Sequence, residues 1–348
     1  AGSMIVQEMR TNPQLHLEPV GFVDDDPEKF GQYIHGIRVL GTLQDIPMIV
    51  LDYQIDEVII AMPTAPGKVI RSVVQACKAS NLPSKTVPGI FEILGGVAKV
   101  SEVRDVQIED LLRRGVVQHE IEGVMPLIRG TRVMVTGAGG SIGAELCRQI
   151  CGCTPAELFL VGHGENSIFQ IAAELRRQNA GENGSVNIHT IIADIRDRER
   201  MTHVFQSYKP QLIFHAAAHK HVGLMEGNLP DAVTNNVLGT KILVDLADEF
   251  GVDRFILISS DKAVNPLCIM GVTKRVAELI VDDAALRTGR AFVTVRFGNV
   301  LGSRGSVVPI FKQQIAQGGP LYITDPNVKR YFMTIPEAVQ LVLQSAYI

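Results

Sequence analysis

The stretch Arg132-Val-Met-Val-Thr-Gly-Ala-Gly-Gly-Ser-Ile-Gly143 decides the fold of this chain. Its first five residues form a short apolar run, which is typical of a strand buried in a parallel sheet. The glycines follow directly and lead into a helical pattern from Ser141 to Ile150. Glycine lets the backbone turn tightly and approach a pyrophosphate, which then lies on the N-terminus of the helix. A dinucleotide-binding turn is therefore predicted, and a purely structural turn between strand and helix is the alternative.

Strand-like and helix-like segments alternate regularly from Thr131 onward. This alternation predicts the α/β class, with a Rossmann-like doubly wound parallel sheet and ligand sites at the carboxyl ends of its strands. The expected elements are strands at 132–136, 157–161, 188–192, 212–216, 255–259 and 292–296, and helices at 230–249 and 273–288.

A smaller α/β pattern precedes this region. Residues 19–23 and 56–61 are predicted as short strands, and residues 68–80 have the spacing of an amphipathic helix. The alternation predicts a small layer with a parallel sheet. It contains neither a complete phosphate loop nor an evident acid–base pair, so a regulatory or spacer role is predicted.

The domain limits that follow are 1–90 for the small Rossmann-like domain, 91–130 for a linker and 131–348 for the catalytic domain. Within the linker, residues 106–112 have helical spacing and residues 126–130 resemble a connection. The last domain is expected to bind NAD(P) and to carry a C-terminal, truncated substrate-binding part.

Composition excludes several classes of protein. The chain has 348 residues, of which 46% are hydrophobic and 20% charged, and its net charge of −4 gives no reason to expect a nucleic-acid partner. Five cysteines, an odd number, indicate a reducing compartment. No metal site is predicted, because Cys147, Cys151 and Cys153 lack a matching ligand pair elsewhere. No apolar run reaches the roughly 18 residues that a bilayer requires. The missing initiating Met and an apparent helix at 336–348, in which the chain stops, indicate part of a longer protein.

The spacing of Gly137, Gly140 and Gly143 resembles that of short-chain dehydrogenase/reductase proteins. The resemblance implies that a dinucleotide is held by the glycine turn and by the ends of the expected strands at 188–192 and 212–216. The implied contacts are Gly137, Gly139, Gly140, Ser141, Ile142, Gly143, Asp194, Ile195, Ala216, Ala217 and Ala218.

An acidic residue at the end of strand two would bind the adenosine ribose and favour NAD. Here that strand runs into Val161-Gly-His-Gly-Glu-Asn166. Glu165 could fold back to fill this role, whereas Arg176 or Arg177 could instead meet a 2′-phosphate. The choice between NAD and NADP stays open.

Ser260-Asp261-Lys262 follows the expected strand at 255–259, at its carboxyl end. Active sites in this fold lie at the carboxyl ends of the strands. Met270-Gly-Val-Thr-Lys274 then opens a helix, in the place where the superfamily has Tyr-x-x-x-Lys. Positions four apart lie on one helical face, so Met270 and Lys274 are expected side by side.

Several phrases together resemble UDP-N-acetylglucosamine 4,6-dehydratases of the large, membrane-associated polysaccharide-biosynthesis type. Members of this type carry Met at the Tyr position, and a membrane-spanning region precedes their first soluble domain. Gly223 and Gly227 depart from the pattern, in a loop that more often carries Pro and Glu. The phrases are Val135–Gly143, His215–Val222, Asn235–Thr240, Ser260–Pro266, Arg296–Ile310 and Arg330–Pro336.

The resemblance implies a reaction on UDP-N-acetylglucosamine with tightly bound NAD or NADP. C4 is oxidised, water is eliminated across C5 and C6, and the hydride returns to C6. Asp261 is the implied acid at the C6 oxygen and Lys262 the implied base at C5, so a protonated Asp and a neutral Lys are expected. Ser260 is expected to relay the C4 hydroxyl proton with Lys274, and Met270 to pack or leave room for a water.

The resemblance also implies further ligand contacts, a cellular location and an oligomeric state. Lys274 and Asn236 are implied cofactor contacts, and His219 and His221 could face the sugar. The full-length protein is expected on the cytoplasmic side of the bacterial inner membrane, as a homo-oligomer anchored through a segment absent from this chain. A UDP-sugar 4-epimerase and a non-catalytic Rossmann module are the alternatives. The implied substrate contacts are Lys220, Asn299, Arg304, Ser306, Val307, Lys312 and Arg330.

Overall fold

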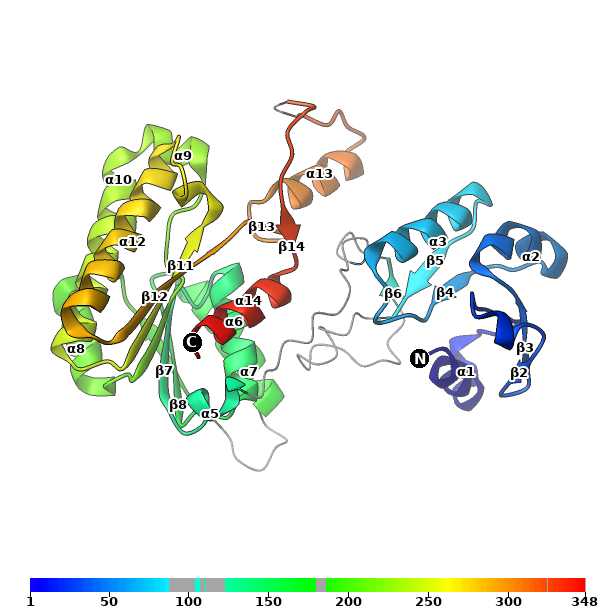
Figure 1. Ribbon diagram of the computed structural model, residues 1–348, viewed down its shortest axis with the longest axis horizontal. Coiled ribbons are helices and arrows are strands. Elements are labelled where there is room, and N and C mark those ends of the chain that lie inside the picture. The colour runs from blue at the N-terminus through cyan, green and yellow to red at the C-terminus, as the bar shows by residue number, and fades with distance from the viewer. Residues whose placement is uncertain (88–103, 107–109, 111–122, 180–185, 324, 348) are drawn as a thin grey trace. The chain divides into compact units, whose positions relative to one another are not determined.

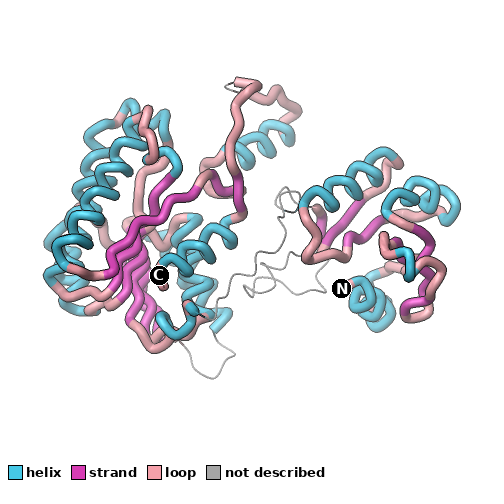
Figure 2. Tube along the Cα trace, viewed as in Figure 1, coloured by secondary structure: helices cyan, strands magenta, loops and turns pink. Residues whose placement is uncertain are grey.

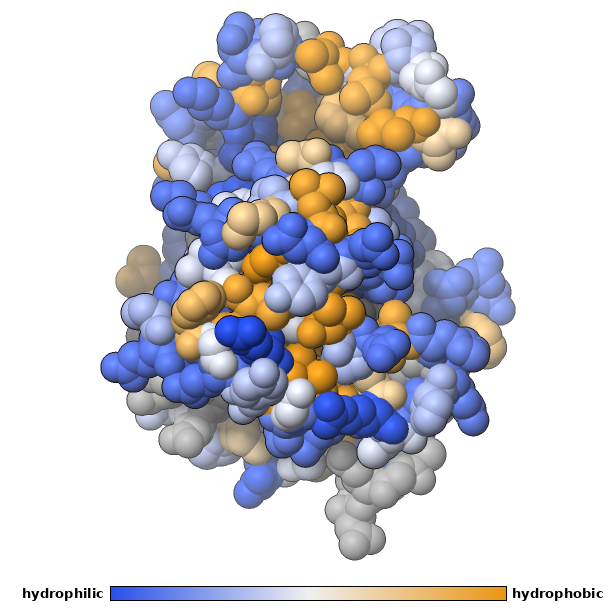
Figure 3. Space-filling model, turned by 90° about the vertical axis from the view of Figure 1, so that its right-hand side faces the viewer, coloured by the Kyte–Doolittle hydropathy of each residue, from blue (hydrophilic) through white to orange (hydrophobic). Residues whose placement is uncertain are grey.

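The computed structural model describes residues 1–87, 104–106, 110, 123–179, 186–323 and 325–347. The chain divides into an N-terminal unit, Ala1–Gln118, and a C-terminal unit, His119–Ile348. Within the described ranges, no helix is long and apolar enough to cross a bilayer. Apolar and polar side chains are mixed on the face drawn in Figure 3, as is usual for the surface of a folded protein.

The N-terminal unit contains two small mixed sheets rather than the expected parallel one. In each sheet one pair of strands is parallel and the other antiparallel, with orders β1-β3-β2 and β4-β5-β6. The expected strands at 19–23 and 56–61 and the helix at 68–80 are confirmed as β1, β4 and α3. The elements are α1 Gly2–Thr11, η1 Pro13–Leu15, β1 Phe22–Val23, η2 Pro27–Lys29, β2 Tyr33–Ile34, β3 Ile37–Gly41, η3 Leu43–Asp45, α2 Ile46–Tyr53, β4 Val58–Ile60, α3 Gly67–Ala79, β5 Ser84–Thr86 and β6 Arg104–Asp105.

A six-stranded sheet, parallel throughout, forms the centre of the C-terminal unit, as predicted. Its strand order, β12-β11-β10-β7-β8-β9, is that of a doubly wound nucleotide-binding fold. The six strands are β7 Arg132–Thr136, β8 Glu157–Gly162, β9 Asn187–Ile192, β10 Leu212–His215, β11 Arg254–Ser260 and β12 Ala291–Phe297. The four inner strands, β11, β10, β7 and β8, are largely apolar because both of their faces are covered, whereas the edge strands β9 and β12 are partly exposed (Figures 1 and 2).

Two apolar cores hold helices against the sheet. One face packs against α6, α7 and α14, through residues such as Leu146, Leu175 and Val342. The other packs against α8, α11 and α12, through residues such as Phe205 and Val281. The helices of this unit are α5 Met125–Ile128, α6 Ser141–Gly152, α7 Glu165–Asn179, α8 Arg198–Tyr208, α9 Val222–Gly227, α10 Leu229–Val233, η6 Thr234–Gly239, α11 Thr240–Glu249, η7 Asp261–Ala263, α12 Ile269–Thr288, α13 Val307–Ala316 and α14 Ile335–Ser345.

Three sequence predictions differ from the structure in detail. Residues 230–249 are helical but not one α-helix, because the middle segment, η6, is a π-helix. The expected connection at 126–130 is wrong: α5 forms there, with Pro126 at its start and Ile128 buried. The final helix, α14, ends at Ser345 rather than continuing to the end of the chain. Residues 107–109, 111 and 112 of the segment with helical spacing lie outside the described residues.

His215 at the end of β10 is a buried, neutral link between three elements. Its Nδ1 lies 2.7 Å from Thr136 Oγ1, and its Nε2 lies 2.9 Å from Thr240 Oγ1. Burial, aided by the positive charge of Lys274, lowers the pKa of His215 from 6.5 to about 3.

This burial predicts a pH-dependent loss of stability. Between pH 6.5 and 3 the unfolded chain binds a proton at His215 that the folded chain does not, so stability falls as pH falls through this window. The contribution of this residue should be about 1.4 kcal/mol per pH unit. His215→Gln should lack that contribution, which chemical denaturation of both proteins at pH 4 to 7 would reveal as a shallower slope. Parallel slopes would contradict the assignment.

Candidate active site

The site lies at the point where the chain changes direction across the sheet. β7 continues to β8 on one side, whereas β10, its neighbour, continues to β11 on the other. Crevices at such points hold ligands in open α/β sheets. A pocket of about 1110 Å³ opens there, walled by the glycine turn, by the segments after β10, β11 and β12, and by the loop before β14 Phe332–Met333.

The glycine turn is a tight backbone cradle. Gly137 has φ +70°, and a Cβ there would lie 2.6 Å from the Ala217 nitrogen. A Cβ on Gly143 would lie 2.1 Å from the Gly137 oxygen, and one on Gly139 would lie 2.3 Å from Ser167 Oγ. The backbone of α6 can therefore come close to a phosphate only because side chains are absent. No side chain caps the N-terminus of α6, where Ser141 is the first residue.

The residues predicted to hold the adenosine half differ in their surroundings. Asp194 accepts hydrogen bonds from Arg196, including one of 2.7 Å from Nη2, and these contacts lower its pKa. Ile195 is buried and packs against Gly239. Glu165 is exposed at the first residue of α7. Arg176 and Arg177, in the last turn of α7, are the residues expected to meet a 2′-phosphate.

Asn236 contacts protein rather than the pocket. Its Oδ1 accepts a 2.8 Å hydrogen bond from the His219 backbone, and its Nδ2 donates to the His219 carbonyl at 3.0 Å and to Thr273 Oγ1 at 3.1 Å. The residue is 1% exposed. Asn236 therefore fixes the segment after β10 to α12, where sequence reasoning had expected a direct cofactor contact. Ala216 and Ala218 of that segment do line the pocket.

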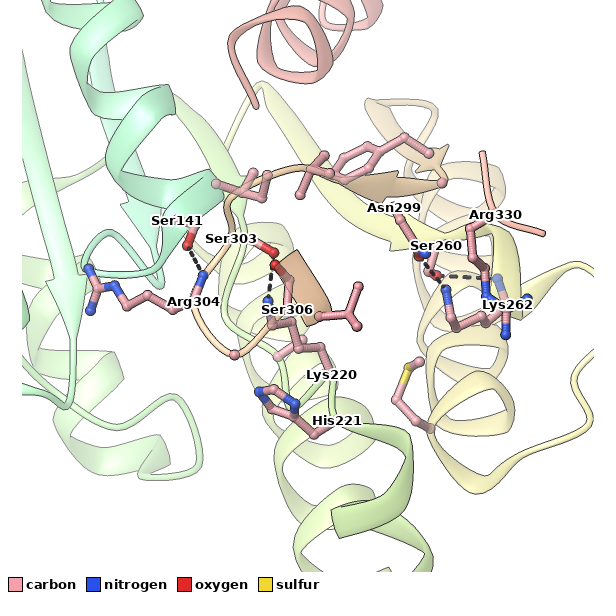
Figure 4. A pocket seen from close by; sticks show the side chains of 18 of the residues that line it. Ser141, Lys220, His221, Ser260, Lys262, Asn299, Ser303, Arg304, Ser306 and Arg330 are labelled. Atoms are coloured by element: carbon pink, nitrogen blue, oxygen red, sulfur yellow. Dashed lines mark hydrogen bonds between the residues drawn. The ribbon is translucent and has the colours of Figure 1, made fainter. Parts of the chain in front are cut away.

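Ser260, Asp261 and Lys262 come together at the end of β11. Ser260 Oγ and Lys262 Nζ each donate a 3.0 Å hydrogen bond to Asp261 Oδ1. Lys262 Nζ also donates to Asn299 Oδ1 at 3.0 Å, so Asn299 aims the amine into the pocket (Figure 4). Ser260, Lys262 and Asn299 line the pocket.

The geometry corrects the expected protonation of Asp261. Burial would raise the pKa of this carboxyl, but the hydrogen bonds from Lys262 and Ser260 outweigh burial and the pKa lies below its ordinary value. The side chains of Asp261 and Lys262 are still 42% and 31% exposed. Asp261 is therefore ionised here, where sequence reasoning had expected a protonated acid.

Lys274 and Met270 lie on one face of α12 and both line the pocket, as predicted from their spacing. Lys274 is 5% exposed, and its Nζ donates a 2.6 Å hydrogen bond to the Ile258 carbonyl. Burial lowers the pKa of Lys274 to about 8, and the nearby Glu278 carboxylate acts in the opposite sense. Met270 packs against Met225 and Ala232.

Glu278 is a supporting residue that sequence reasoning missed. It is 1% exposed and accepts hydrogen bonds from Ser259 Oγ at 2.6 Å, Arg296 Nε at 2.8 Å and Arg275 Nη1 at 3.0 Å. Burial would raise its pKa, but these donors lower it to about 2. The carboxylate therefore ties α12 to β11 and β12 directly behind Ser260. Its position four residues after Lys274, on the same helical face, was the available signal.

The predicted substrate contacts separate into groups. Lys220 Nζ donates to Ser303 Oγ at 3.3 Å. The buried Ser306 hydroxyl, at the N-cap of α13, has no hydrogen-bond partner among the residues that the structure describes. Val307 and Arg330 line the pocket, whereas Lys312 lies on α13 outside its wall. Sequence reasoning missed an apolar wall from the loop before β14, because this loop has no regular period. That wall includes Tyr322, Ile323, Pro326 and Val328, and Phe311 of α13 extends it.

Arg304 takes an unexpected position. Its Nη2 donates a 2.7 Å hydrogen bond to the Gly139 carbonyl, and its backbone nitrogen donates to Ser141 Oγ at 3.1 Å. The predicted substrate contact thus lies on the cofactor turn. Within the described part of the chain, no group of three His, Cys, Asp or Glu residues could hold a metal ion.

The strand order, the glycine cradle and the groups after β10 and β11 define a short-chain dehydrogenase/reductase fold of the extended type. In agreement, the structure of Pen from Bacillus thuringiensis is similar, with a TM-score of 0.59 and 31% identity over 64% of this chain and 67% of that one. Residues 133–348 match the family described as polysaccharide biosynthesis protein, and residues 1–88 match the CoA-binding domain family. The chain belongs to the polysaccharide biosynthesis protein family.

The chain is similar to polysaccharide biosynthesis proteins and, over its C-terminal part, to nucleotide-sugar dehydratases and epimerases. The probable polysaccharide biosynthesis protein EpsC of Bacillus subtilis is 45% identical over 99% of this chain, which spans 57% of EpsC. The inverting UDP-N-acetylglucosamine 4,6-dehydratase of Campylobacter jejuni serotype O:23/36 is 31% identical over 63% of the chain and 64% of its own length. The UDP-glucose 4-epimerase of Rickettsia rickettsii is 33% identical over 61% of each.

Proposed function

We propose that this chain is the catalytic portion of an NAD(P)-dependent dehydratase that converts UDP-N-acetylglucosamine to the 4-keto-6-deoxy sugar nucleotide. The observation that carries the proposal is the Lys262–Asp261 pair, hydrogen-bonded at 3.0 Å and aimed by Asn299, at the strand end beside the glycine cradle. Elimination of water across adjacent carbons needs a base and an acid side by side.

The residues of the cradle fit a dinucleotide, because the backbone approach at Gly137 and Gly143 would be filled by any Cβ. When bound, the nicotinamide supplies a hydride acceptor for C4 and a hydride donor for C6. Asp194, Glu165, Ala216 and the turn itself are the proposed contacts, with either NAD or NADP as the cofactor.

The ion pair becomes an acid and a base by one internal proton transfer. A hexose over the pair would remove water from it, which disfavours the charged forms of both groups. Movement of a proton from Lys262 Nζ to Asp261 Oδ1, across their 3.0 Å hydrogen bond, gives the neutral amine and the protonated acid. Lys262 then removes the C5 proton, which the 4-ketone has acidified. Asp261 protonates the C6 oxygen, and the C6–O bond breaks to release water.

Ser260 is the proposed relay for the C4 hydroxyl proton. Its hydroxyl lines the pocket and contacts Asp261, and Lys274, with a pKa of about 8, lies at the Ile258 carbonyl behind it. A group with a pKa near the working pH can both accept and return a proton. Met270 occupies the tyrosine position with an apolar side chain and leaves this role to Ser260 and Lys274.

The substrate-binding half suits a nucleoside diphosphate. We assign the UDP phosphates to the N-terminus of α13, where Ser306, Val307 and Lys220 line the pocket. The Ser306 hydroxyl, which has no partner among the described residues, is available to a phosphate oxygen. Arg330 lies beside Lys262 at the reacting end (Figure 4). Tyr322 and the apolar wall provide a surface on which a base can stack.

The family resemblance also supports a setting for the whole protein. We propose a homo-oligomer on the cytoplasmic side of the inner membrane, anchored by a segment outside this chain and serving polysaccharide, capsule or glycan synthesis.

The decisive experiment is mass spectrometry of the product formed from UDP-N-acetylglucosamine with NAD⁺ or NADP⁺. Loss of one water, with no net consumption of cofactor, is the expected result. Conversion to UDP-N-acetylgalactosamine without loss of water would instead show a 4-epimerase, the activity named for the Rickettsia relative. Bound dinucleotide with no reaction on any UDP-sugar would show a non-catalytic cofactor-binding module.

A further inference from the structure

The turn from Gly302 to Ser306 contributes four residues to the wall of the pocket, Ser303 to Ser306. Gly302 and Gly305 have φ of +68° and +69°, which glycine adopts readily. The Ser306 nitrogen donates a 2.9 Å hydrogen bond to the Ser303 carbonyl. His221 packs so closely below the turn that a Cβ on Gly305 would lie 2.5 Å from its Cε1. Arg304, at the tip, is therefore presented in a fixed place.

That place is on the cofactor turn. The backbone nitrogen of Arg304 donates a hydrogen bond to Ser141 Oγ, and its Nη2 donates one to the Gly139 carbonyl. Arg304 therefore contacts both the first residue of α6 and the glycine turn that precedes this helix. Figure 4 shows the Arg304 side chain extending away from Lys262 and Arg330, which lie at the other end of the pocket.

The guanidinium has spare capacity for an anion. Arginine carries five N–H donors, and the Gly139 carbonyl takes one side-chain contact here. Among the described residues, no carboxylate forms an ion pair with Arg304, and the residue is exposed. An uncompensated cation at a helix N-terminus with no side-chain cap favours a phosphate group.

We propose that Arg304 binds the diphosphate of the dinucleotide rather than that of the sugar nucleotide. The turn 302–306 would then serve both ligands, with Arg304 on the cofactor and Ser306, at the N-cap of α13, on the substrate. Release of the cofactor would require this turn to move, which accounts for a dinucleotide that stays bound through each cycle. The inference rests on the proposed function for the nature of the two ligands.

Binding measurements with single ligands test the assignment. Calorimetric titration of the whole chain with NAD⁺, NADP⁺, ADP-ribose, adenosine and UDP would compare wild type, Arg304→Gln and the control Arg330→Gln. Arg304→Gln should weaken dinucleotide and ADP-ribose binding by about tenfold to a hundredfold, since charged hydrogen bonds are lost. Adenosine, which lacks the diphosphate, and UDP should bind as in wild type. Arg330→Gln should leave dinucleotide binding intact.

Each other outcome has a defined meaning. Weaker UDP binding with unchanged dinucleotide binding would overturn the inference and restore the substrate role expected from the sequence. Unchanged binding of all ligands would show that the Gly139 contact has no role in recognition. A wild type that binds dinucleotide through Arg304 but forms no dehydrated product would overturn the proposed function alone. Equal melting temperatures would confirm that the exposed substitution leaves the fold intact.

Discussion

Replacing Lys262 by Ala should stop formation of the dehydrated sugar while hydride transfer from C4 continues. The expected fall in turnover is about 10³-fold, within the range for loss of a general base. Because only the C5 proton abstraction is removed, reduced nicotinamide should accumulate at 340 nm as the 4-keto sugar forms. In D₂O, the wild type should incorporate deuterium at C5 and the variant should not. Mass spectrometry and absorbance measure both effects.

Two variants separate the roles of the pair from general damage. Asp261→Asn should lose water slowly, because the C6 oxygen lacks its acid. It should also slow C5 exchange, because Lys262 loses the carboxylate that takes its proton. Lys241→Ala removes an exposed lysine of α11 that pairs with Asp245 and should turn over normally. Near-normal dehydration by Lys262→Ala would rule out this residue as the base.

Adding one methyl group at Gly143 should remove dinucleotide binding. The Cβ would lie 2.1 Å from the Gly137 oxygen, 2.7 Å from the Gly137 carbonyl carbon and 2.9 Å from Ala138 Cα. All three are backbone atoms, so the turn itself must move and the cradle widens. Gly143→Ala should weaken NAD(P)⁺ binding by more than about a hundredfold and lower the free energy of unfolding by about 2–4 kcal/mol.

Gly152→Ala is the matched control, since it lies at the end of the same helix and a Cβ there meets nothing within 4 Å. It should keep full affinity and be neutral or slightly stabilising. Titration calorimetry and urea denaturation measure the two quantities. Equal affinities of both variants would mean that the turn does not form the dinucleotide site.

The central sheet was predictable because its four inner strands are buried on both faces. Val133, Leu160 and Ile256 are inaccessible to solvent, and such positions produce the continuous apolar runs that mark parallel strands in sequence. The sheets of the N-terminal unit gave weaker signals, because β2 and β6 are only two residues long. β2 pairs antiparallel with the next strand through a local hairpin, Ile34 opposite Ile37, whereas β6 pairs with β5 about 20 residues earlier, which local pattern does not encode.

The candidate site was predictable where chemistry follows a strand directly. Ser260, Lys262 and Asn299 meet as the order of strands requires, because the carboxyl ends of adjacent parallel strands share one edge. Glu278 was missed because a helical glutamate usually faces solvent, and only the fold shows that its neighbours are two arginines and Ser259. The orientation of Arg304 depends on how the turn 302–306 packs, which motif spacing does not specify. The ligand roles of all these residues stay predictions.

The hydrogen bond from Lys262 to Asn299 links the segment after β11 to β13, two segments with different proposed roles. Lys262 follows β11 of the central sheet. Asn299 lies in β13 Asn299–Val300, which pairs with β14 Phe332–Met333 and begins the part that we propose to bind the sugar nucleotide. Grafting residues 300–333 from a relative to change sugar preference should preserve the base. A graft that starts one residue earlier and places another side chain at position 299 would remove the hydrogen-bond acceptor that orients the Lys262 amine. That chimaera should bind its new substrate but turn it over slowly.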